Sequence, residues 1–419
     1  MTTEQPTSTL PTSARARRNN ALAPTLLLIV AVLLVSANLR PAITGLGPVL
    51  DEVRSSLGAS SAFASVITAL PVLCFGLAGL LAPVLARQHG IRRALGFALA
   101  LLTAGLVVRV LDGPAVVLAG TFIACAGIAV CNVLIPVVIR ESFPAKIGLL
   151  TGFYTAALQG AAALSAVVTP VLDTAFGGWR PALGSWAVLA ALALIGWLIA
   201  ARPGRPVEPE PDTDPVAHDL GELAPPATAE PRSLLRSRLA WSVTVFFGLQ
   251  AMFAYAAMGW IPQVLMSAGV SRGLAGVMTG VLSVLGVPLS LIVTPLASRA
   301  RSQSAWLAGT TAVGIVGVLG LLLAPSAAPW VWSICLGIGM GVFAIAVALI
   351  SLRSRSVADT RALSTMAQSF GYLFAVLGPL LFGMLHGLTG GWTVSLLFIL
   401  AVLVAQAGVG IMAGRPRFV

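Results

Sequence analysis

Arg40 is a charged residue in a place where a charge is costly. The stretch 21–50 carries no other charged residue. About twenty apolar residues are enough to span a bilayer, so this stretch predicts a transmembrane helix. Arg40 then lies roughly 15 Å inside the membrane, at about 1.5 Å per residue. An arginine at such depth usually faces a protein interior or a watery cavity, which favours a cationic group that binds an anionic or strongly polar small solute. The alternative is that Arg40 snorkels outward or pairs with a partner elsewhere.

The residues around Arg40 indicate a polar face on a weakened helix. Ser36, Arg40 and Thr44 are spaced four apart, which places them on one helical face. Pro41, Gly45 and Pro48 weaken the helix around this face. Unwound segments with free carbonyl groups are common at transporter binding sites.

Two further polar stripes occur about 213 residues apart. Each has polar residues at four-residue spacing with a tyrosine on or beside the stripe, so we expect equivalent helices in two halves of the chain. The stripes are Thr151, Thr155 and Gln159 with Tyr154, and Ser364, Gln368 and Tyr372. With Asn132 and Gln250 from two other apolar runs, the expected substrate-binding residues are Arg40, Thr44, Asn132, Tyr154, Gln159, Gln250, Gln368 and Tyr372.

These polar residues also have a structural interpretation. Serine, threonine and glutamine often join membrane helices through hydrogen bonds. A glutamine offers four hydrogen-bonding sites, which packing rarely satisfies, so the glutamines fit either role. Asn132 precedes Pro136 by one turn, where it would cap freed carbonyls. Tyr255 and Trp260 fit a core or interfacial position as well as a pathway.

The composition is that of a polytopic membrane protein. Of the 419 residues 58% are hydrophobic and only 9% are charged, which a soluble domain could not accommodate. The net charge of +11 follows the membrane pattern, and no basic run is interleaved with aromatics, so a nucleic-acid partner is not expected. The four cysteines lack a CxxC spacing and the three histidines are scattered, so we expect no disulfide framework, metal or cofactor.

The apolar runs predict an all-α membrane protein of twelve transmembrane helices in two six-helix, pseudo-symmetric halves. The expected division is an N-terminal tail (1–21), a first half (22–201), a proline-rich acidic linker (202–239), a second half (240–413) and a C-terminal tail (414–419). The expected spans are 22–50, 60–86, 92–110, 114–138, 148–172, 181–201, 240–267, 274–297, 305–324, 328–350, 361–386 and 392–413.

The basic residues predict the orientation. With both termini in the cytoplasm, 20 of the 25 basic residues fall on the inner side and four on the outer side, with Arg40 inside the membrane. The outer four are Arg54, Arg109, Arg180 and Arg272.

Short landmarks recur at an offset of about 212 residues. Pro83–Arg87 matches Pro295–Arg299, and Gly177–Trp179 matches Gly390–Trp392. Several matches at one offset indicate a parallel duplication of a six-helix unit.

The segment Asn38–Pro48 (NLRPAITGLGP) resembles the opening signature of the cyanate/nitroimidazole permease group of the major facilitator superfamily. Supporting matches are Gly127–Pro136, Thr151–Thr155, Met366–Tyr372, Gly378–Pro379 and Thr389–Trp392. The chain departs from the superfamily pattern at Ala86 and at Gly387, where an acidic residue is expected. A charge lock that uses the acid before Arg87 is therefore missing.

The resemblance implies a secondary transporter of the bacterial plasma (inner) membrane, a monomer in the lipid bilayer that moves a cyanate-like or nitroimidazole-like solute by alternating access. The alternative is a proton-coupled multidrug efflux transporter. That alternative is weakened because Asp51, Glu52, Asp112 and Asp173 lie only at span edges, and proton-driven efflux generally needs a membrane carboxylate. An enzyme is not expected, since no nucleophile–base or metal constellation is visible.

Overall fold

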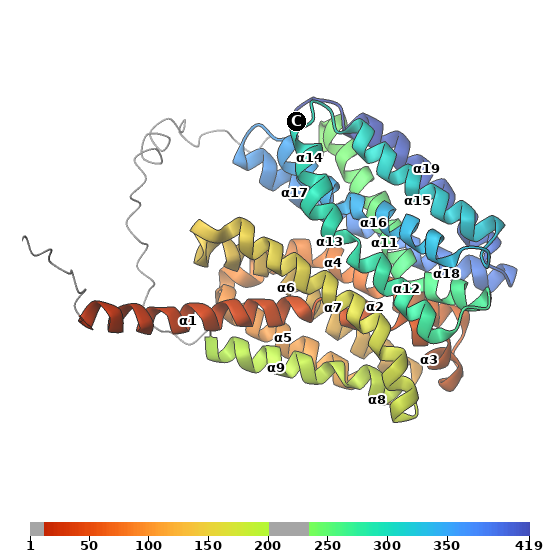
Figure 1. Cartoon of the computed structure of the whole chain (residues 1–419), viewed down its shortest axis with the longest axis horizontal. Helices are drawn as coiled ribbons and strands as arrows, with labels where there is room; N and C mark the ends of the chain where they lie inside the picture. The colour runs from red at the N-terminus through yellow and green to blue at the C-terminus, as the bar shows by residue number, and fades with distance from the viewer. Residues whose placement is uncertain (1–11, 201–233) are drawn as a thin grey trace, which may run out of the picture.

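The computed structural model describes residues 12–200 and 234–419, and within them twelve helical spans are long and apolar enough to cross a membrane (Figure 1). The predicted fold class is therefore confirmed. Residues 1–11 and most of the expected linker lie outside the described residues. The spans are 25–56, 61–89, 91–108, 114–142, 149–176, 179–200, 238–267, 272–299, 304–323, 329–352, 362–389 and 393–413.

The helices of each half run in chain order. The first half consists of α1 (Thr12–Ala37), α2 (Pro41–Thr44), the 3-10 turn η1 (Gly47–Val49), α3 (Leu50–Ser56), α4 (Ser61–His89), α5 (Ile91–Val108), α6 (Pro114–Ser142), η2 (Pro144–Lys146), α7 (Ile147–Phe176), α8 (Trp179–Gly184) and α9 (Trp186–Ala200). The second half consists of η3 (Leu234–Arg236), α11 (Arg238–Ser267), α12 (Arg272–Val284), α13 (Gly286–Pro288), the π-helix η4 (Leu289–Val293), α14 (Thr294–Arg299), α15 (Ser304–Leu323), α16 (Pro329–Leu352), α17 (Val357–Ala375), α18 (Leu377–Thr389) and α19 (Thr393–Ala413).

The sequence repeat at an offset of about 212 residues corresponds to helices that end in the same way in both halves. Gly177 ends α7 with φ 72°, and Gly390 ends α18 with φ 69°. Both glycines adopt the left-handed conformation that terminates helices and that other residues rarely adopt. The recurrent glycine–glycine–tryptophan sequence thus marks the same turn in both halves.

Four spans are interrupted: the sixth at Ser185 and the eleventh at Val376, each for a single residue, and the first and the eighth more extensively. The first is interrupted between Ala37 and Pro41, so α1 gives way to the short α2 and then to η1. The eighth is interrupted at Leu285 and continues through the π-helix Leu289–Val293. Single π-turns inside α-helices occur frequently at functional sites.

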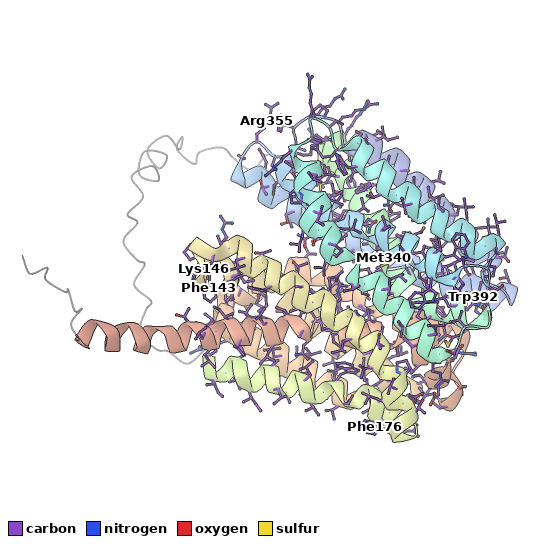
Figure 2. The ribbon with its side chains drawn as sticks, viewed as in Figure 1. Phe143, Lys146, Phe176, Met340, Arg355 and Trp392 are labelled. Carbon is purple, nitrogen blue, oxygen red and sulfur yellow. The ribbon has the colours of Figure 1, made fainter. Side chains whose placement is uncertain are left out.

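The two halves form separate bundles that converge at one end (Figure 1). We call this end, which carries Glu52, Asp173 and Arg272, the Asp173 end. The opposite end, which carries Lys146 and Arg355, is called the basic end (Figure 2).

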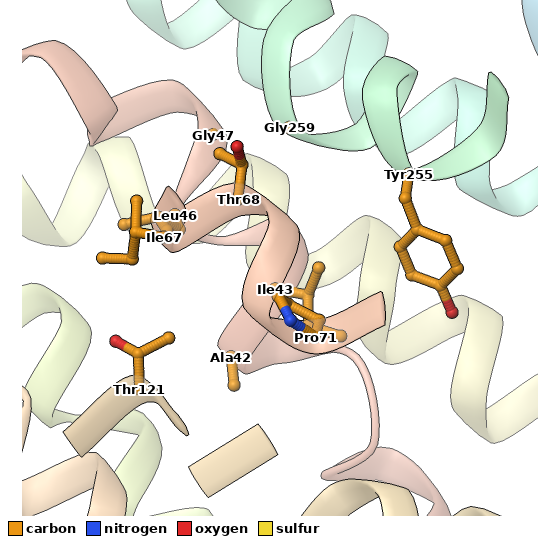
Figure 3. Close-up of a pocket in the computed structure, with 10 residues that line it drawn as sticks. All are labelled: Ala42, Ile43, Leu46, Gly47, Ile67, Thr68, Pro71, Thr121, Tyr255 and Gly259. Carbon is orange, nitrogen blue, oxygen red and sulfur yellow. The ribbon is translucent and has the colours of Figure 1, made fainter. Parts of the chain in front are cut away.

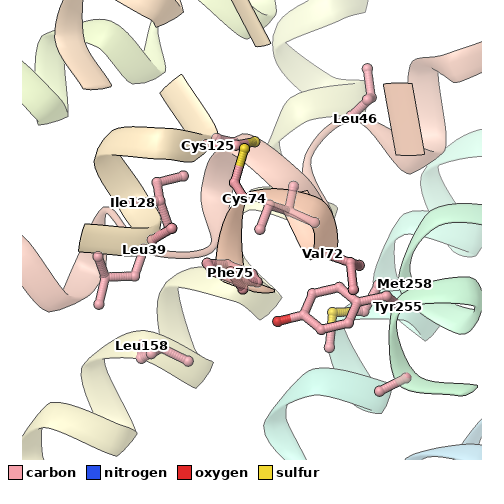
Figure 4. Close-up of a cluster of buried hydrophobic side chains, with 14 of the residues drawn as sticks. Leu39, Leu46, Val72, Cys74, Phe75, Cys125, Ile128, Leu158, Tyr255 and Met258 are labelled. Atoms are coloured by element: carbon pink, nitrogen blue, oxygen red, sulfur yellow. The ribbon is translucent and has the colours of Figure 1, made fainter. Parts of the chain in front are cut away.

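The halves touch closely from the membrane centre to the Asp173 end. A Cβ at Gly276 of α12 would collide with the carbonyl oxygen of Ala166 in α7. Gln263 of α11 donates a hydrogen bond of 2.9 Å to the carbonyl oxygen of Gly47 in η1. Most of the buried apolar side chains form one cluster that runs through both halves, and Figure 4 shows part of it.

Candidate functional site

The break in the first span determines where Arg40 lies. Arg40 immediately precedes α2, and its φ of −124° and ψ of −31° are not helical. Pro41 follows and has no backbone N–H to continue the helix from α1. The predicted weakening of this helix is confirmed, and it places the guanidinium group at the interface between the halves.

Arg40 contacts the opposite half through Tyr255 of α11. Its Nη1 donates a hydrogen bond of 2.7 Å to the Tyr255 hydroxyl, and its Cζ lies 5.4 Å from the centre of the same ring. Arg40 is 9% exposed and Tyr255 is 4% exposed. The contact therefore combines a hydrogen bond with a cation–π interaction in a buried setting.

The charge of Arg40 has no carboxylate partner. Among the described residues, the ion pairs involve Arg54, Arg180 and Arg272, but not Arg40. The Nε of Arg40 is buried and has no hydrogen-bond partner. Buried charges are normally paired, so this unpaired cation is suited to bind an anion.

All three tyrosines of the chain gather around Arg40. Tyr154 of α7 and Tyr372 of α17 both lie within electrostatic range of the guanidinium, as Tyr255 does. The rings of Tyr255 and Tyr372 are 6.3 Å apart, and Phe75 of α4 lies 5.7 Å from the first and 5.6 Å from the second. Figure 4 shows Phe75 beside Tyr255. Residues from both halves therefore form a ring-lined centre.

Three of the expected site residues lie on the basic-end side of this centre. The Tyr154 hydroxyl donates a hydrogen bond of 3.3 Å to the Asn132 side-chain oxygen of α6. Gln368 donates one of 2.8 Å to the Ser364 hydroxyl. Tyr154, Asn132 and Gln368 are all half-buried. Asn132 is thus paired with a side chain of the cluster.

Gln159 connects the halves at the break in the eighth span. Its Nε2 donates a hydrogen bond of 3.0 Å to the carbonyl oxygen of Ser283. Its amide also packs against Gly286, where an added Cβ would lie 2.5 Å from Nε2. Gln159 therefore contacts the point at which α12 ends.

Thr44 and Gln250 are placed in helix packing. The Thr44 hydroxyl lies 2.6 Å from the Ser165 hydroxyl within the first half. Gln250 donates a hydrogen bond of 2.8 Å to the carbonyl oxygen of Met340, and Gln406 donates one of 3.0 Å to Gln250. Thr44 follows Arg40 by one helical turn, but its hydroxyl also donates a hydrogen bond of 3.0 Å to the carbonyl oxygen of Ala162, so it contacts α7.

Tyr255 and Phe75 were not among the expected site residues. No spacing pattern distinguishes a pathway tyrosine from one in the core, and Phe75 lies in a wholly apolar run. The one signal for Tyr255 in the sequence was that tyrosine is rare in this chain. The chain has three tyrosines, and all of them lie inside spans.

A small cavity lies between Arg40 and the Asp173 end. It is lined by residues of α2, α4 and α6 together with Tyr255 and Gly259 of α11 (Figure 3). Its free volume of about 10 Å³ has room for about one water molecule. In this conformation the route from Arg40 to the Asp173 end is therefore filled by side chains.

Arg109, at the end of α5, supports the segment that carries Arg40. It is 2% exposed, and its Nη1 donates a hydrogen bond of 2.8 Å to the carbonyl oxygen of Ala42 in α2. The backbone N–H of Leu46 bonds to Ile43 instead, so the helix break leaves the Ala42 carbonyl without its usual partner. Arg109 supplies that partner.

An ion pair between the halves is present at the Asp173 end. Arg272 of α12 lies 2.6 Å from a carboxylate oxygen of Glu52 and 2.5 Å from one of Asp173. Asp173 is 4% exposed, although it lies near the end of its span. Within the described residues, no three histidine, cysteine, aspartate or glutamate side chains are grouped as a metal site requires.

Comparisons with known proteins identify the family. Residues 26–379 match the family model of the Major Facilitator Superfamily. The chain is 35% identical to the uncharacterized transporter YycB of Bacillus subtilis over 395 residues, which are 94% of each chain. It is 34% identical to the 2-nitroimidazole transporter of Escherichia coli over 394 residues, which are 94% of this chain and 96% of that one.

More distant similarities agree. The cyanate transport protein CynX of Escherichia coli is 26% identical over 367 residues, covering 87% of this chain and 91% of that one. A bacterial homologue of the lysosomal transporter Spinster has the same fold, with a TM-score of 0.72 at 15% identity over 92% of this chain and 96% of that one. The chain therefore belongs to the major facilitator superfamily, in the group that resembles the cyanate and nitroimidazole permeases, and is a membrane transporter rather than an enzyme.

Proposed function

We propose that this protein moves a small anionic or polar solute, cyanate-like or nitroimidazole-like, across the bacterial plasma membrane by alternating access. The observation that carries the proposal is Arg40, a buried cation between the halves with no carboxylate partner among the described residues. A solute anion would supply the missing charge. A guanidinium group suits this role because it is planar, always charged and able to form two parallel hydrogen bonds.

The expected division of the chain fits this mechanism. The halves 22–201 and 240–413 would rock against each other as units, with the solute bound between them. In the described conformation contacts between the halves extend from Arg40 to the Asp173 end, and α4 also packs against α17 at Gly79 and Ser369. Asn132, Tyr154 and Gln368 lie on the other side and are half-buried, which supports access to the site from the basic end.

We further propose that the basic end faces the cytoplasm, together with both termini and the linker. The described residues of this end include Arg87, Arg140, Arg299 and Arg353, in agreement with the preference of cytoplasmic loops for basic residues. The conformation would then be open toward the cytoplasm. We expect the protein to work as a monomer, because the proposed site is formed within one chain.

The test is solute binding by variants of Arg40, measured calorimetrically on purified protein with cyanate, 2-nitroimidazole and a panel of small anions. Arg40→Ala should abolish binding while membrane insertion is preserved, because the substitution makes the span more apolar. Arg40→Lys should retain weakened binding, because it keeps the charge but loses the planar fork. Arg54→Ala is the control, since Arg54 forms only an exposed ion pair with Asp51. Near-normal affinity in Arg40→Ala would refute the proposal.

A further inference from the structure

The centre that surrounds Arg40 is mainly aromatic. Tyr372 contacts three other rings, with centres 5.6 Å away in Phe75, 6.3 Å away in Tyr255 and 5.0 Å away in Phe247. The Phe247 contact is edge-on, at 81° between the ring planes. These contacts fix the orientation of the Tyr372 ring before any solute arrives.

One ring of this cluster remains partly uncovered. Phe75, Tyr255 and Phe247 are between 1% and 6% exposed, whereas Tyr372 is half-buried. A cluster that served packing alone would have no reason to leave this ring accessible beside an unpaired cation. Tyr372 is thus the tyrosine of this cluster that a solute at Arg40 could reach, and a tyrosine side chain is largely apolar and polarisable.

Tyr154 approaches the same place from the first half. It lies within electrostatic range of both Arg40 and Tyr372. Among the described residues, the Tyr154 ring makes no ring–ring contact with Phe75, Tyr255, Tyr372 or Phe247. A solute at Arg40 would therefore lie near Tyr372 of the second half and Tyr154 of the first half.

We propose that the solute bound at Arg40 is a planar aromatic anion of the benzoate type, with its carboxylate on the guanidinium and its ring against Tyr372. This inference rests on the proposed function and selects one class within it. A carboxylate matches the two-pronged donor geometry of arginine. A linear anion such as cyanate would satisfy the charge and leave the prepared ring surface unused.

Three probes separate charge from ring. Benzoate carries both features, cyclohexanecarboxylate keeps the charge in a non-planar ring of similar size, and benzamide keeps the planar ring without the charge. Binding of each to the purified full-length protein is measured by calorimetry. We expect benzoate to bind at least about threefold more tightly than cyclohexanecarboxylate, in line with the strength of aromatic contacts. Benzamide should bind at least about tenfold more weakly than benzoate, because an ionic hydrogen bond is lost.

Variants assign the preference to Tyr372. Tyr372→Leu should reduce the benzoate-to-cyclohexanecarboxylate ratio to about one, whereas Tyr372→Phe should keep it because the ring remains. Phe370→Leu is the matched control: it removes an aromatic ring from the same helix, but Phe370 is 47% exposed and its ring contact is with Trp241, outside the cluster. Far-ultraviolet circular dichroism and melting temperature confirm that each variant is folded.

The possible outcomes test the aromatic class of the solute separately from the proposed transport of an anion. Equal affinity for the two acids, or a ratio that Tyr372→Leu leaves unchanged, would overturn the aromatic class. Benzamide binding as tight as that of benzoate would overturn the anionic requirement. If benzoate does not bind but another anion binds in an Arg40-dependent way, the inference fails while the proposed function stands. If no anion binds in an Arg40-dependent way, both fail.

Discussion

Arg40 and Tyr255 are 215 positions apart in the chain, yet a hydrogen bond of 2.7 Å joins them across the two halves of the transporter. The Tyr255 hydroxyl occupies a donor of the guanidinium that a solute anion would need. The same contact therefore holds the halves together and covers part of the proposed site.

Replacement of Tyr255 by phenylalanine should tighten solute binding. The substitution keeps the ring over Arg40 and removes only the hydroxyl that competes for Nη1. A buried donor left unpaired costs about 1–3 kcal/mol in the solute-free state, so we expect affinity to rise by at least about fivefold. Calorimetric titration of Tyr255→Phe and wild type provides the comparison. Weaker binding would mean that the hydroxyl holds the solute instead of competing with it.

The ion pair at the Asp173 end should control opening at that end. Arg272→Gln removes the links to Glu52 and Asp173 and leaves the buried Asp173 carboxylate without its cation. Because Arg272 is 42% exposed, we expect a modest shift of about 1 kcal/mol toward opening. A cysteine at Thr68, which lines the small cavity, should then react faster with a membrane-impermeant maleimide in a background without native cysteines.

A matched control exists in the first half. Arg180→Gln breaks the exposed pair with Asp112, which has a distance of 2.7 Å and does not connect the halves. Its labelling rate at Thr68→Cys should equal that of the parent. Combining Arg272→Gln with Asp173→Asn should reverse part of the effect, because the unpaired carboxylate is also removed. Equal labelling in all four proteins would show that the pair does not hold this end closed.

Arg109 should act as a positioning residue for Arg40. Arg109→Ala leaves the Ala42 carbonyl unpaired and loosens α2, so solute affinity should fall by about tenfold, equivalent to about 1.4 kcal/mol. Arg109→Lys should recover part of the loss, because it still donates a hydrogen bond. Affinity and melting temperature are measured together on the purified variants. A fall in melting temperature with unchanged affinity would restrict Arg109 to a role in stability.

The orientation has its own test. A single cysteine in the linker, in a background without native cysteines, should resist an impermeant reagent in intact cells and react once the membrane is opened. This follows from the excess of basic residues at one end of the helices. Ready labelling in intact cells would reverse the proposed orientation.

Local chemistry made the spans and the first helix break predictable. Apolar length predicts a span whatever its neighbours, and Pro41 disrupts the α1 helix whatever the fold. The expected span 114–138 corresponds to the helix Pro114–Ser142, whose beginning a proline marks. The expected end was earlier than the observed one because Arg140 and Glu141 extend the helix beyond the apolar run.

Contacts between the halves were not predictable, since they depend on packing. No spacing in the sequence relates Arg40 to Tyr255 or Gln159 to Ser283. The hydrogen-bond partners of Gln250 were equally unpredictable from the sequence. Its amide group satisfies Met340 and Gln406, which are 90 and 156 positions away. The substrate-binding roles expected for the polar residues remain predictions that the binding experiments above address.

The π-helix Leu289–Val293 fixes the angular phase of the eighth span. An α-helix turns by about 100° per residue, so the residue accommodated in a π-turn rotates everything beyond it relative to an uninterrupted helix. The extra residue in the π-turn therefore determines which side chains of Thr294–Arg299 face the neighbouring helices. Deleting a single residue from 289–293 should therefore restore a regular helix and leave Arg299 on its present face, whereas rewinding the same five residues as α-helix would turn Arg299 by about 100°, although no side chain at the basic end is itself altered.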